Sequence, residues 1–245
     1  MIGTIEHNNQ VFQVDFSNPL DISLPVKLGG VKAWYVDEPT FEPVRMGDWV
    51  GEVKQGGSVD FKNIFFNPHG HGTHTECVGH ISKEFYSVND SMKQFMFMAK
   101  LITVMPQNIA HDKVITGEQI KRLVDVPTEA IIIRTLANDK HKMTKNYTQT
   151  NPPFLEDVAI YYLLELGVRH LLIDTPSVDK EVDGGALKSH HAFWNYPDNP
   201  NILKTITELI YVDDSIHDGS YLLDLQVAAF ENDAAPSRPI LYKIF

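Results

Sequence analysis

Apolar residues gather in short runs of β-branched and aromatic side chains rather than in long helical stripes. The runs that predict strands are residues 11–14, 31–36, 59–66, 95–104, 130–134, 169–174, 221–230 and 240–244. Within the fifth run, the residues from Ala130 to Ile133 are continuously apolar. Such a run is typical of a strand that is buried on both faces. The pattern therefore predicts a chain that is rich in strands.

Two segments carry the signals of helix ends. Thr116 and Gln119 have the spacing of a capping box, which predicts a short helix running to about Val124. A second helix is expected after the prolines at 152 and 153, and Gly167 would end it. No repeat or linker interrupts the chain. We therefore expect a single domain over residues 1–245, with an α/β fold in which a mixed, β-rich sheet or barrel carries flanking helices.

Composition narrows the class of protein. At 43% hydrophobic and 22% charged residues, the chain has enough apolar material for the core of a soluble protein. It holds 21 basic against 32 acidic residues, a net charge of −11, and its arginines are scattered. A chain without a basic patch is repelled by nucleic acid and by anionic membranes, so we expect neither as a partner.

Targeting signals and disulfides are not apparent in the sequence. The first ten residues have neither a basic nor an apolar segment, and no apolar run approaches the ~18 residues of a membrane span. Cys77 is the single cysteine, so the chain can form no internal disulfide. These features favour a cytoplasmic protein.

Histidines are concentrated in one segment. Four of the 11, His69, His71, His74 and His80, lie within residues 69–80. If this segment is extended, alternation places His74, Glu76 and His80 on one side. Imidazole and carboxylate are preferred ligands of zinc and related divalent metals, so the segment predicts a metal site. The alternative interpretation of the spacing is a solvated polar loop.

A second polar cluster lies far downstream. It consists of Ser189, His190 and His191, followed by Glu208 within the apolar residues 206–210. Burying the Glu208 carboxylate would be costly unless it pairs with a cation. The alternative is an outward-facing glutamate on a surface helix or an edge strand.

These residues resemble a known family. Gly72-Thr73-His74, followed by Glu76 and His80, is similar to the signature His-x-Gly-Thr-His-x-Asp-x-Pro-x-His of the bacterial kynurenine formamidase and putative-cyclase family. Further similar segments, in the same order along the chain, are Asp15-Phe16-Ser17-Asn18-Pro19-Leu20, Ile133-Arg134-Thr135, Ile173-Asp174-Thr175-Pro176-Ser177-Val178-Asp179, Ser189-His190-His191 and Thr207-Glu208-Leu209.

The resemblance implies a fold of the swivelling β/β/α type and a metal-dependent amide hydrolase. The substrate would be a small-molecule amide, such as N-formylkynurenine in tryptophan catabolism, and the protein a homo-oligomer, either a dimer or a tetramer. The family also includes isatin hydrolase-like enzymes that open cyclic amides. The resemblance further implies one or two divalent ions, zinc first and manganese as the alternative. Carried over by position, the ligands are His74, Glu76, His190 (or its neighbour His191) and Glu208, with His80 as acid/base.

The chain departs from the signature at three positions. Gly70 stands where the family has its first histidine, Glu76 replaces the aspartate, and Val78 replaces the proline. A β-bulge at the glycines would add one residue between His69 and His74 and bring His69 onto the ligand face. We therefore expect His69 to substitute for the missing ligand, ahead of His71 or a water molecule.

Two alternatives to a metal-dependent hydrolase remain open, and a third is excluded. Cys77 could act as a nucleophile with His74 or His80 as its base, although a lone cysteine is more often a buried hydrophobe. A serine hydrolase is excluded because no Gly-x-Ser-x-Gly segment occurs. With Gly70 in a ligand position, the chain could also be a metal-poor binding protein that lost the reaction. Aromatic residues that could line a substrate pocket, or equally belong to the core, are Trp34, Tyr35, Phe65, Phe66 and Trp194.

Overall fold

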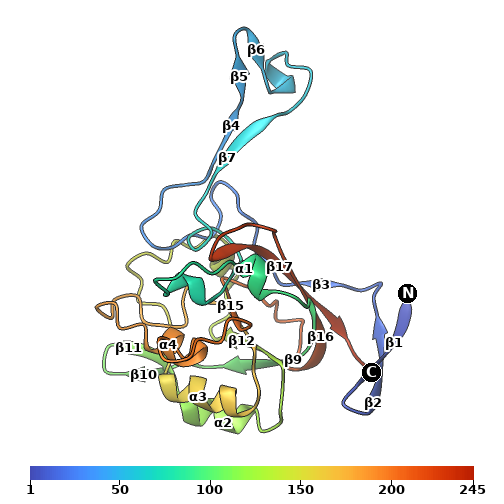
Figure 1. The fold of residues 1–245 in the computed structure, drawn as a ribbon, viewed down its shortest axis with the longest axis vertical. Helices are drawn as coiled ribbons and strands as arrows, with labels where there is room; N and C mark the ends of the chain where they lie inside the picture. Colours follow the sequence, from blue (N-terminus) through green and yellow to red (C-terminus); the bar gives the residue numbers. More distant parts are fainter.

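A ring of seven strands forms the centre of the protein in the computed structural model, which describes residues 1–245 (Figure 1). The ring closes because its first strand pairs with its last. In order around the ring, the strands are β16 (Gly219–Val227), β9 (Met96–Val104), β12 (Ala130–Thr135), β14 (His170–Ile173), β15 (Thr205–Glu208), β8 (His74–Glu76) and β17 (Ala234–Lys243). The predicted mixed, β-rich barrel is confirmed.

The barrel joins a parallel half to an antiparallel half. Strands β9, β12, β14 and β15 run parallel, whereas β8, β16 and β17 pair with their neighbours in antiparallel fashion. In β12 all six residues are buried, as the continuous apolar run predicts. Ile131 and Ile133 belong to the core beneath the helices, whereas Ala130 and Ile132 belong to the core within the barrel.

Three helices lie together on one side of the barrel (Figure 1). They are α2 (Gly117–Leu123), α3 (Asp157–Glu165) and α4 (Lys188–Trp194), whereas the short α1 (Val88–Ser91) lies apart from them, near β17. The capping box of α2 is present with both of its hydrogen bonds. Ala159, Ile160 and Leu163 of α3 are buried against the barrel. A small sheet lies beside these helices, built from β10 (Gln107–Ile109), β11 (Asp112–Ile115) and β13 (Phe154–Leu155).

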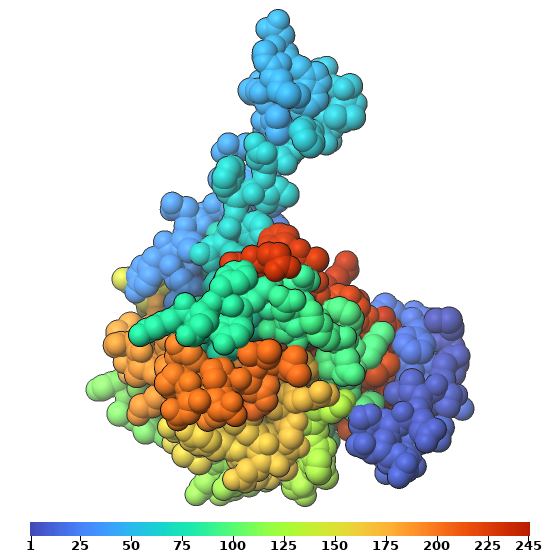
Figure 2. Space-filling view, viewed as in Figure 1, coloured from blue at the N-terminus to red at the C-terminus, as the bar shows by residue number.

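Two hairpins project from the barrel. One is a long arm formed by β4 (Thr40–Pro43) and β7 (Lys62–Phe65), with β5 (Arg45–Met46) and β6 (Trp49–Val50) near its tip. The other pairs β1 (Ile2–His7) with β2 (Gln10–Asp15) and lies beside the C-terminus, while the short β3 (Leu20–Asp21) joins the edge of β17. The arm stands clear of the rest of the molecule (Figure 2).

Several expected strands differ from the structure. Residues 31–36 form no strand, because Trp34 and Tyr35 have left-handed φ angles of 61° and 60° that turn the chain. Strand β17 begins at Ala234 rather than at residue 240, and β16 ends at Val227 rather than at residue 230. No helix of the protein has the length and apolar character needed to cross a bilayer.

Candidate metal centre

The short strand β8 is the floor of the site. It lies between β15 and β17, where His74 is directly opposite Glu208 and Glu76 is directly opposite Ala234. Its three residues are fully buried. Because side chains alternate along a strand, His74 and Glu76 point to the same side, as the sequence predicts. The Nε2 atom of His74 lies 3.4 Å from Oε2 of Glu208.

The histidine-rich segment is not one extended strand, which corrects the parity argument. Asn67 folds residues 67–71 into a turn, since its carbonyl accepts the backbone N–H groups of Gly70 and His71. A Cβ atom at residue 70 would lie 2.7 Å from Cγ2 of Val36, so a histidine there would collide with its neighbour. The turn, and not a β-bulge, brings His69 to the site.

His69 lies between two carboxylates. Its Nδ1 atom is 3.0 Å from Oε2 of Glu76, and its Nε2 atom donates to Oδ2 of Asp233 at 2.8 Å. A ring nitrogen held by a carboxylate leaves the other nitrogen as the free lone pair, which is the usual arrangement of a metal-binding histidine. Asp233 thus holds the His69 ring in the orientation that a metal ligand requires.

His80 reaches the site from a single turn of 3₁₀ helix, Val78–His80, rather than from the strand. Its Nδ1 atom lies 3.7 Å from Oε2 of Glu76 and 3.5 Å from Oδ2 of Asp233. The ring packs against His69 with centroids 4.3 Å apart. With 31% of its side chain exposed, against 1% for Glu76, His80 is the more accessible member of the cluster.

His190 enters from α4 on the other side. Its Nδ1 atom donates to Oδ2 of Asp179 at 2.7 Å, which leaves Nε2 facing Oε1 of Glu76 at 3.1 Å. Asp179 also accepts the backbone N–H groups of Ser189 and His190, so one carboxylate fixes both the helix start and the ring. Glu208 accepts the backbone N–H of Val178 and lies 3.9 Å from Nε2 of His190.

The turn from Asp174 to Asp179 contains, besides Asp179, a second carboxylate that anchors the loops around the site. Asp174 is fully buried and accepts both the backbone N–H and the hydroxyl of Thr135. Two of the segments noted in the sequence, Arg134-Thr135 and Asp174 to Asp179, therefore hold each other in place. Burial raises the pKa of Asp174, although the ammonium of Lys142 opposes this effect.

The donor set fits a divalent metal ion. His74 Nδ1 bonds to the carbonyl of Gly72, while its Nε2 atom and Oε2 of Glu76 are buried without a hydrogen-bond partner. Buried polar atoms rarely stay unpaired in proteins, and imidazole with carboxylate is a donor set that zinc and manganese accept. The ligand atoms of His69, His74 and Glu76 lie within 4.8 Å of one another, as do those of Glu76, His80 and His190.

The pKa shifts within the cluster also favour a bound cation. Burial disfavours protonation of His69, but Asp233 and Glu76 outweigh it and raise the pKa of this imidazole to about 10. The pKa of His190 is likewise raised to about 10, because Asp179 and Glu76 outweigh burial. For Glu76, the nearby imidazoles outweigh burial and hold the pKa well below its usual range. The carboxylates thus create a strong demand for positive charge.

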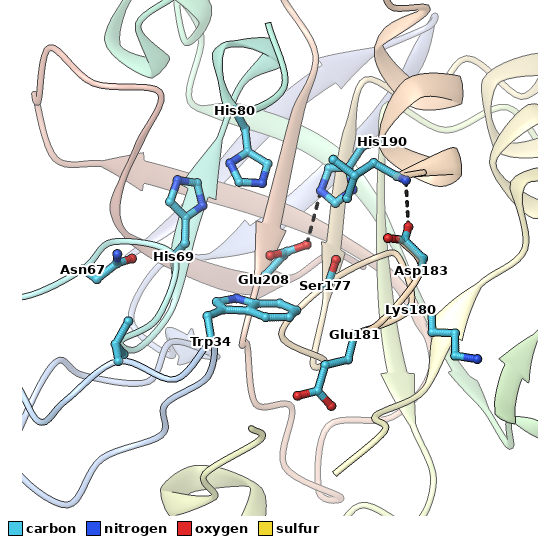
Figure 3. A pocket seen from close by; sticks show the side chains of 12 residues that line it. Trp34, Asn67, His69, His80, Ser177, Lys180, Glu181, Asp183, His190 and Glu208 are labelled. Atoms are coloured by element: carbon cyan, nitrogen blue, oxygen red, sulfur yellow. Dashed lines mark hydrogen bonds and ion pairs between the residues drawn. The ribbon is translucent and has the colours of Figure 1, made fainter. Parts of the chain in front are cut away.

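A pocket of about 340 Å³ opens above the cluster, with His69, His80, His190 and Glu208 in its wall (Figure 3). Trp34 lies across the pocket opposite these side chains (Figure 3). The other aromatic candidates from the sequence do not line it. Tyr35 and Phe65 are exposed, Phe66 packs on Phe230, and Trp194 is buried in the core under α4.

Three candidate residues from the sequence lie outside the cluster. The ring of His71 accepts the backbone N–H of Asn67 and donates to the carbonyl of Asp37, so neither nitrogen is free. His191 bonds through Nδ1 to the carbonyl of Tyr196 and lies outside the pocket lining. Cys77 is buried in the barrel core, and burial raises the pKa of its thiol, which disfavours a reactive thiolate.

Asp233 is the member of the cluster that the sequence pattern did not reveal. It stands immediately before β17, whose pairing with β8 brings it to Glu76. The local signal was its position at the end of the segment Glu231-Asn232-Asp233, which carries two acids and immediately precedes a strand. Because the strand was expected to begin only at residue 240, this acid was not placed at a strand end.

Comparisons with known proteins identify the family of the chain. A family model described as putative cyclase matches residues 14–180. A kynurenine formamidase from Bacillus thuringiensis (strain Al Hakam) is 26% identical over 227 residues, covering 92% of this chain and 97% of that protein.

Solved structures share the fold. A structure described as a predicted metal-dependent hydrolase from Bacillus stearothermophilus has a TM-score of 0.63 at 18% identity, covering 92% of this chain and 98% of the other. Isatin hydrolase A from Labrenzia aggregata has a TM-score of 0.65 at 15% identity, covering 92% and 93%. The family match spans more than half of the sequence and includes the histidine-rich segment. The chain belongs to the putative cyclase family.

Proposed function

We propose that the protein is a metal-dependent hydrolase that cleaves the C–N bond of a small-molecule amide. The observation that carries this proposal is the convergence of four imidazoles and three carboxylates in one largely buried cluster at the base of a pocket. Within the cluster, His74 Nε2 and Glu76 Oε2 have no hydrogen-bond partner. Such a set of unpaired donors is best used by a divalent cation.

The ligands would come from both sides of Glu76. His69, His74 and Glu76 would hold one ion, and Glu76, His190 and Glu208 would complete a second. We propose zinc, with manganese as the alternative, because both accept nitrogen and carboxylate oxygen. Asp233 and Asp179 would not bind directly but would orient His69 and His190 through their remaining ring nitrogens.

The ion that these residues would hold would supply the activation of water and the polarisation of an amide carbonyl. His80 is suited to move the proton, because its ring is the most accessible of the cluster and its Nδ1 faces Glu76 and Asp233. It would take a proton from the attacking water and deliver it to the departing nitrogen. Trp34 would hold the substrate against the opposite wall of the pocket.

For the substrate we propose an aryl formamide such as N-formylkynurenine. Support comes from the kynurenine formamidase of Bacillus thuringiensis, which matches 92% of this chain, and from the aromatic ring of Trp34 at the pocket. A cyclic aryl amide such as isatin is the second candidate, because isatin hydrolases have the same fold. A metal-poor binding protein is disfavoured because His69 lies at Glu76, where it would supply the imidazole that Gly70 lacks.

We also propose a cytoplasmic homo-oligomer, either a dimer or a tetramer. The single cysteine is buried and needs no oxidising compartment. The arm exposes Phe61, Ile64 and Phe65, each by more than half, and a second copy of the chain would cover this apolar surface.

Metal analysis combined with turnover tests the function. The purified protein should contain zinc or manganese, and hydrolysis of N-formylkynurenine should stop with a chelator and return when the metal is restored. Isatin and an unrelated linear amide serve as comparison substrates. Full activity of metal-free protein would contradict the proposal. Stoichiometric metal without turnover of either aryl amide would refute the proposed substrate class.

A further inference from the structure

A second cavity, larger than the one at the metal centre, lies on the other side of the turn from Asp174 to Ser177. Its volume is about 590 Å³. Thr175 lines this cavity, whereas Ser177 lines the pocket over the metal centre, and the two sets of lining residues do not overlap. None of the residues that we assign to hydrolysis lines this second cavity.

The cavity lies where three parallel strands end. Its wall includes Met105 and Pro106 just after β9, Thr135 and Leu136 at the end of β12, and Thr175 just after β14. These strands are neighbours in the parallel half of the barrel. In α/β proteins, the crevice beyond the carboxyl ends of parallel strands is the common place for a ligand.

Positive charge is concentrated in this cavity, although the chain carries a net charge of −11. Lys113, Lys142 and Lys145 all line it. The ammonium of Lys142 is already used, since it donates to the carbonyl and hydroxyl of Thr135 and to the buried carboxylate of Asp174.

The other two lysines have no acidic partner. Neither Lys113 nor Lys145 forms an ion pair, and the amine of Lys145 lies 4.6 Å from the ring centre of Tyr147. Burial, together with Lys113 and Lys142, lowers the pKa of Lys145. Asp139, the acid on the rim, is bonded to the backbone N–H of His141 in its own loop. Two ammonium groups are therefore free to receive an anion.

Part of the wall is apolar. Met105 and Leu136 are 59% and 38% exposed, and Pro153 and the largely buried Tyr147 line the cavity beside polar side chains such as Asn108 and His141. We propose that this cavity binds a small organic carboxylate, whose anionic group is held by Lys113 and Lys145 while its apolar part lies on Met105, Leu136 and Tyr147. A free inorganic anion would leave the apolar wall uncovered and would gain less on binding.

The test uses the metal-loaded protein and 4-fluorobenzoate as the probe, followed by ¹⁹F NMR titration. Lys145→Met and Lys113→Met keep the aliphatic stem and remove the charge, and each should weaken binding by about tenfold or more, as loss of a charged partner does. Lys121→Met is the matched control, because Lys121 also lies over a tyrosine ring, that of Tyr162, but outside the cavity. It should bind the probe as tightly as the wild type.

Two further titrations distinguish this cavity from the metal centre and from a site for any anion or any aromatic ring. Glu208→Gln alters the metal centre and should leave 4-fluorobenzoate binding unchanged; loss of binding in this variant alone would place the anion at the metal and overturn the proposal. Neutral 4-fluorobenzyl alcohol and inorganic phosphate should each bind at least tenfold more weakly than the probe. Equal binding of phosphate would refute an organic ligand, and equal binding of the alcohol would refute the role of the lysines.

Discussion

Two parts of the protein each carry a pair of neighbouring histidines, and in each pair only one ring faces the site. In the turn over residues 67–71, His69 contacts carboxylates, whereas His71 is held by the backbone of Asp37 and Asn67. In α4, His190 faces Glu76 and the adjacent His191 bonds to the carbonyl of Tyr196. The partners of each ring, rather than the residue type, separate a histidine placed to bind a metal from a structural one.

The surroundings of a buried histidine also decide whether its ring is charged. Carboxylate neighbours outweigh burial and raise the pKa of His69 and His190 to about 10. His170 on β14 has no carboxylate partner, only the hydroxyl of Thr205, and burial lowers its pKa to about 3. Buried imidazoles are therefore pushed in opposite directions by what surrounds them.

Replacing each histidine of the two pairs by alanine, one at a time, is the most severe test of this comparison. His69→Ala and His190→Ala should lose most of the bound metal and reduce hydrolysis to background, because each removes a ligand. His71→Ala and His191→Ala should keep the metal, and His71→Ala should cost about 1–3 kcal/mol of stability by leaving buried backbone groups unpaired. Elemental analysis and urea unfolding measure both effects. Metal loss in His71→Ala instead of His69→Ala would break the comparison.

His80 should behave differently from either class of histidine. As the acid/base residue, its change to alanine should lower kcat by roughly 10²–10⁴. Metal content should stay near the wild-type value, because His74, Glu76 and His190 remain. Turnover and metal stoichiometry are measured on the same preparation. Loss of one equivalent of metal from His80→Ala would make His80 a ligand.

Asp233 should have a smaller effect, because it acts through His69. Asp233→Asn keeps the shape of the side chain but weakens its hold on the His69 ring, so metal affinity should fall by about 10–100-fold. Competition with a chromogenic chelator measures this affinity. Glu231→Gln, an exposed acid in the same loop, is the matched control and should leave the affinity unchanged. An unchanged affinity in Asp233→Asn would show that the turn alone orients His69.

The smallest effect concerns the buried, neutral His170. Its folded-state pKa lies below the unfolded value, so its contribution to stability is complete above about pH 6.5 and is lost as the pH falls toward 3. The free energy of unfolding should therefore fall more steeply between pH 6.5 and 4.5 in the wild type than in His170→Asn, by up to about 1.4 kcal/mol per pH unit. Urea unfolding across this range measures the slopes. The exposed His217, changed in the same way, is the control, and equal slopes for wild type and His170→Asn would contradict the assignment.

Much of the fold was predictable because its signals are local. The capping box at Thr116 and Gln119 needs only residues within one helical turn, and the apolar run of β12 needs only its own side chains. The left-handed turn at Trp34 and Tyr35 was missed because β-branched and aromatic composition favours a strand at the same positions.

The sequence by itself determined the chemistry of this protein: the clustered imidazoles, the Glu208 carboxylate in an apolar run, and the parity of His74 and Glu76 on one short strand. Tertiary structure decided which rings are free to bind. The fold brings Asp233 to His69 and Asp179 to His190, and it brings the carbonyls of Asp37 and Tyr196 to the neighbouring rings. Each of these pairings, except that of Tyr196, joins residues more than ten positions apart. The role of a ring depends on partners that no local pattern encodes, because a hydrogen bond is set by distance in space and not by separation along the chain.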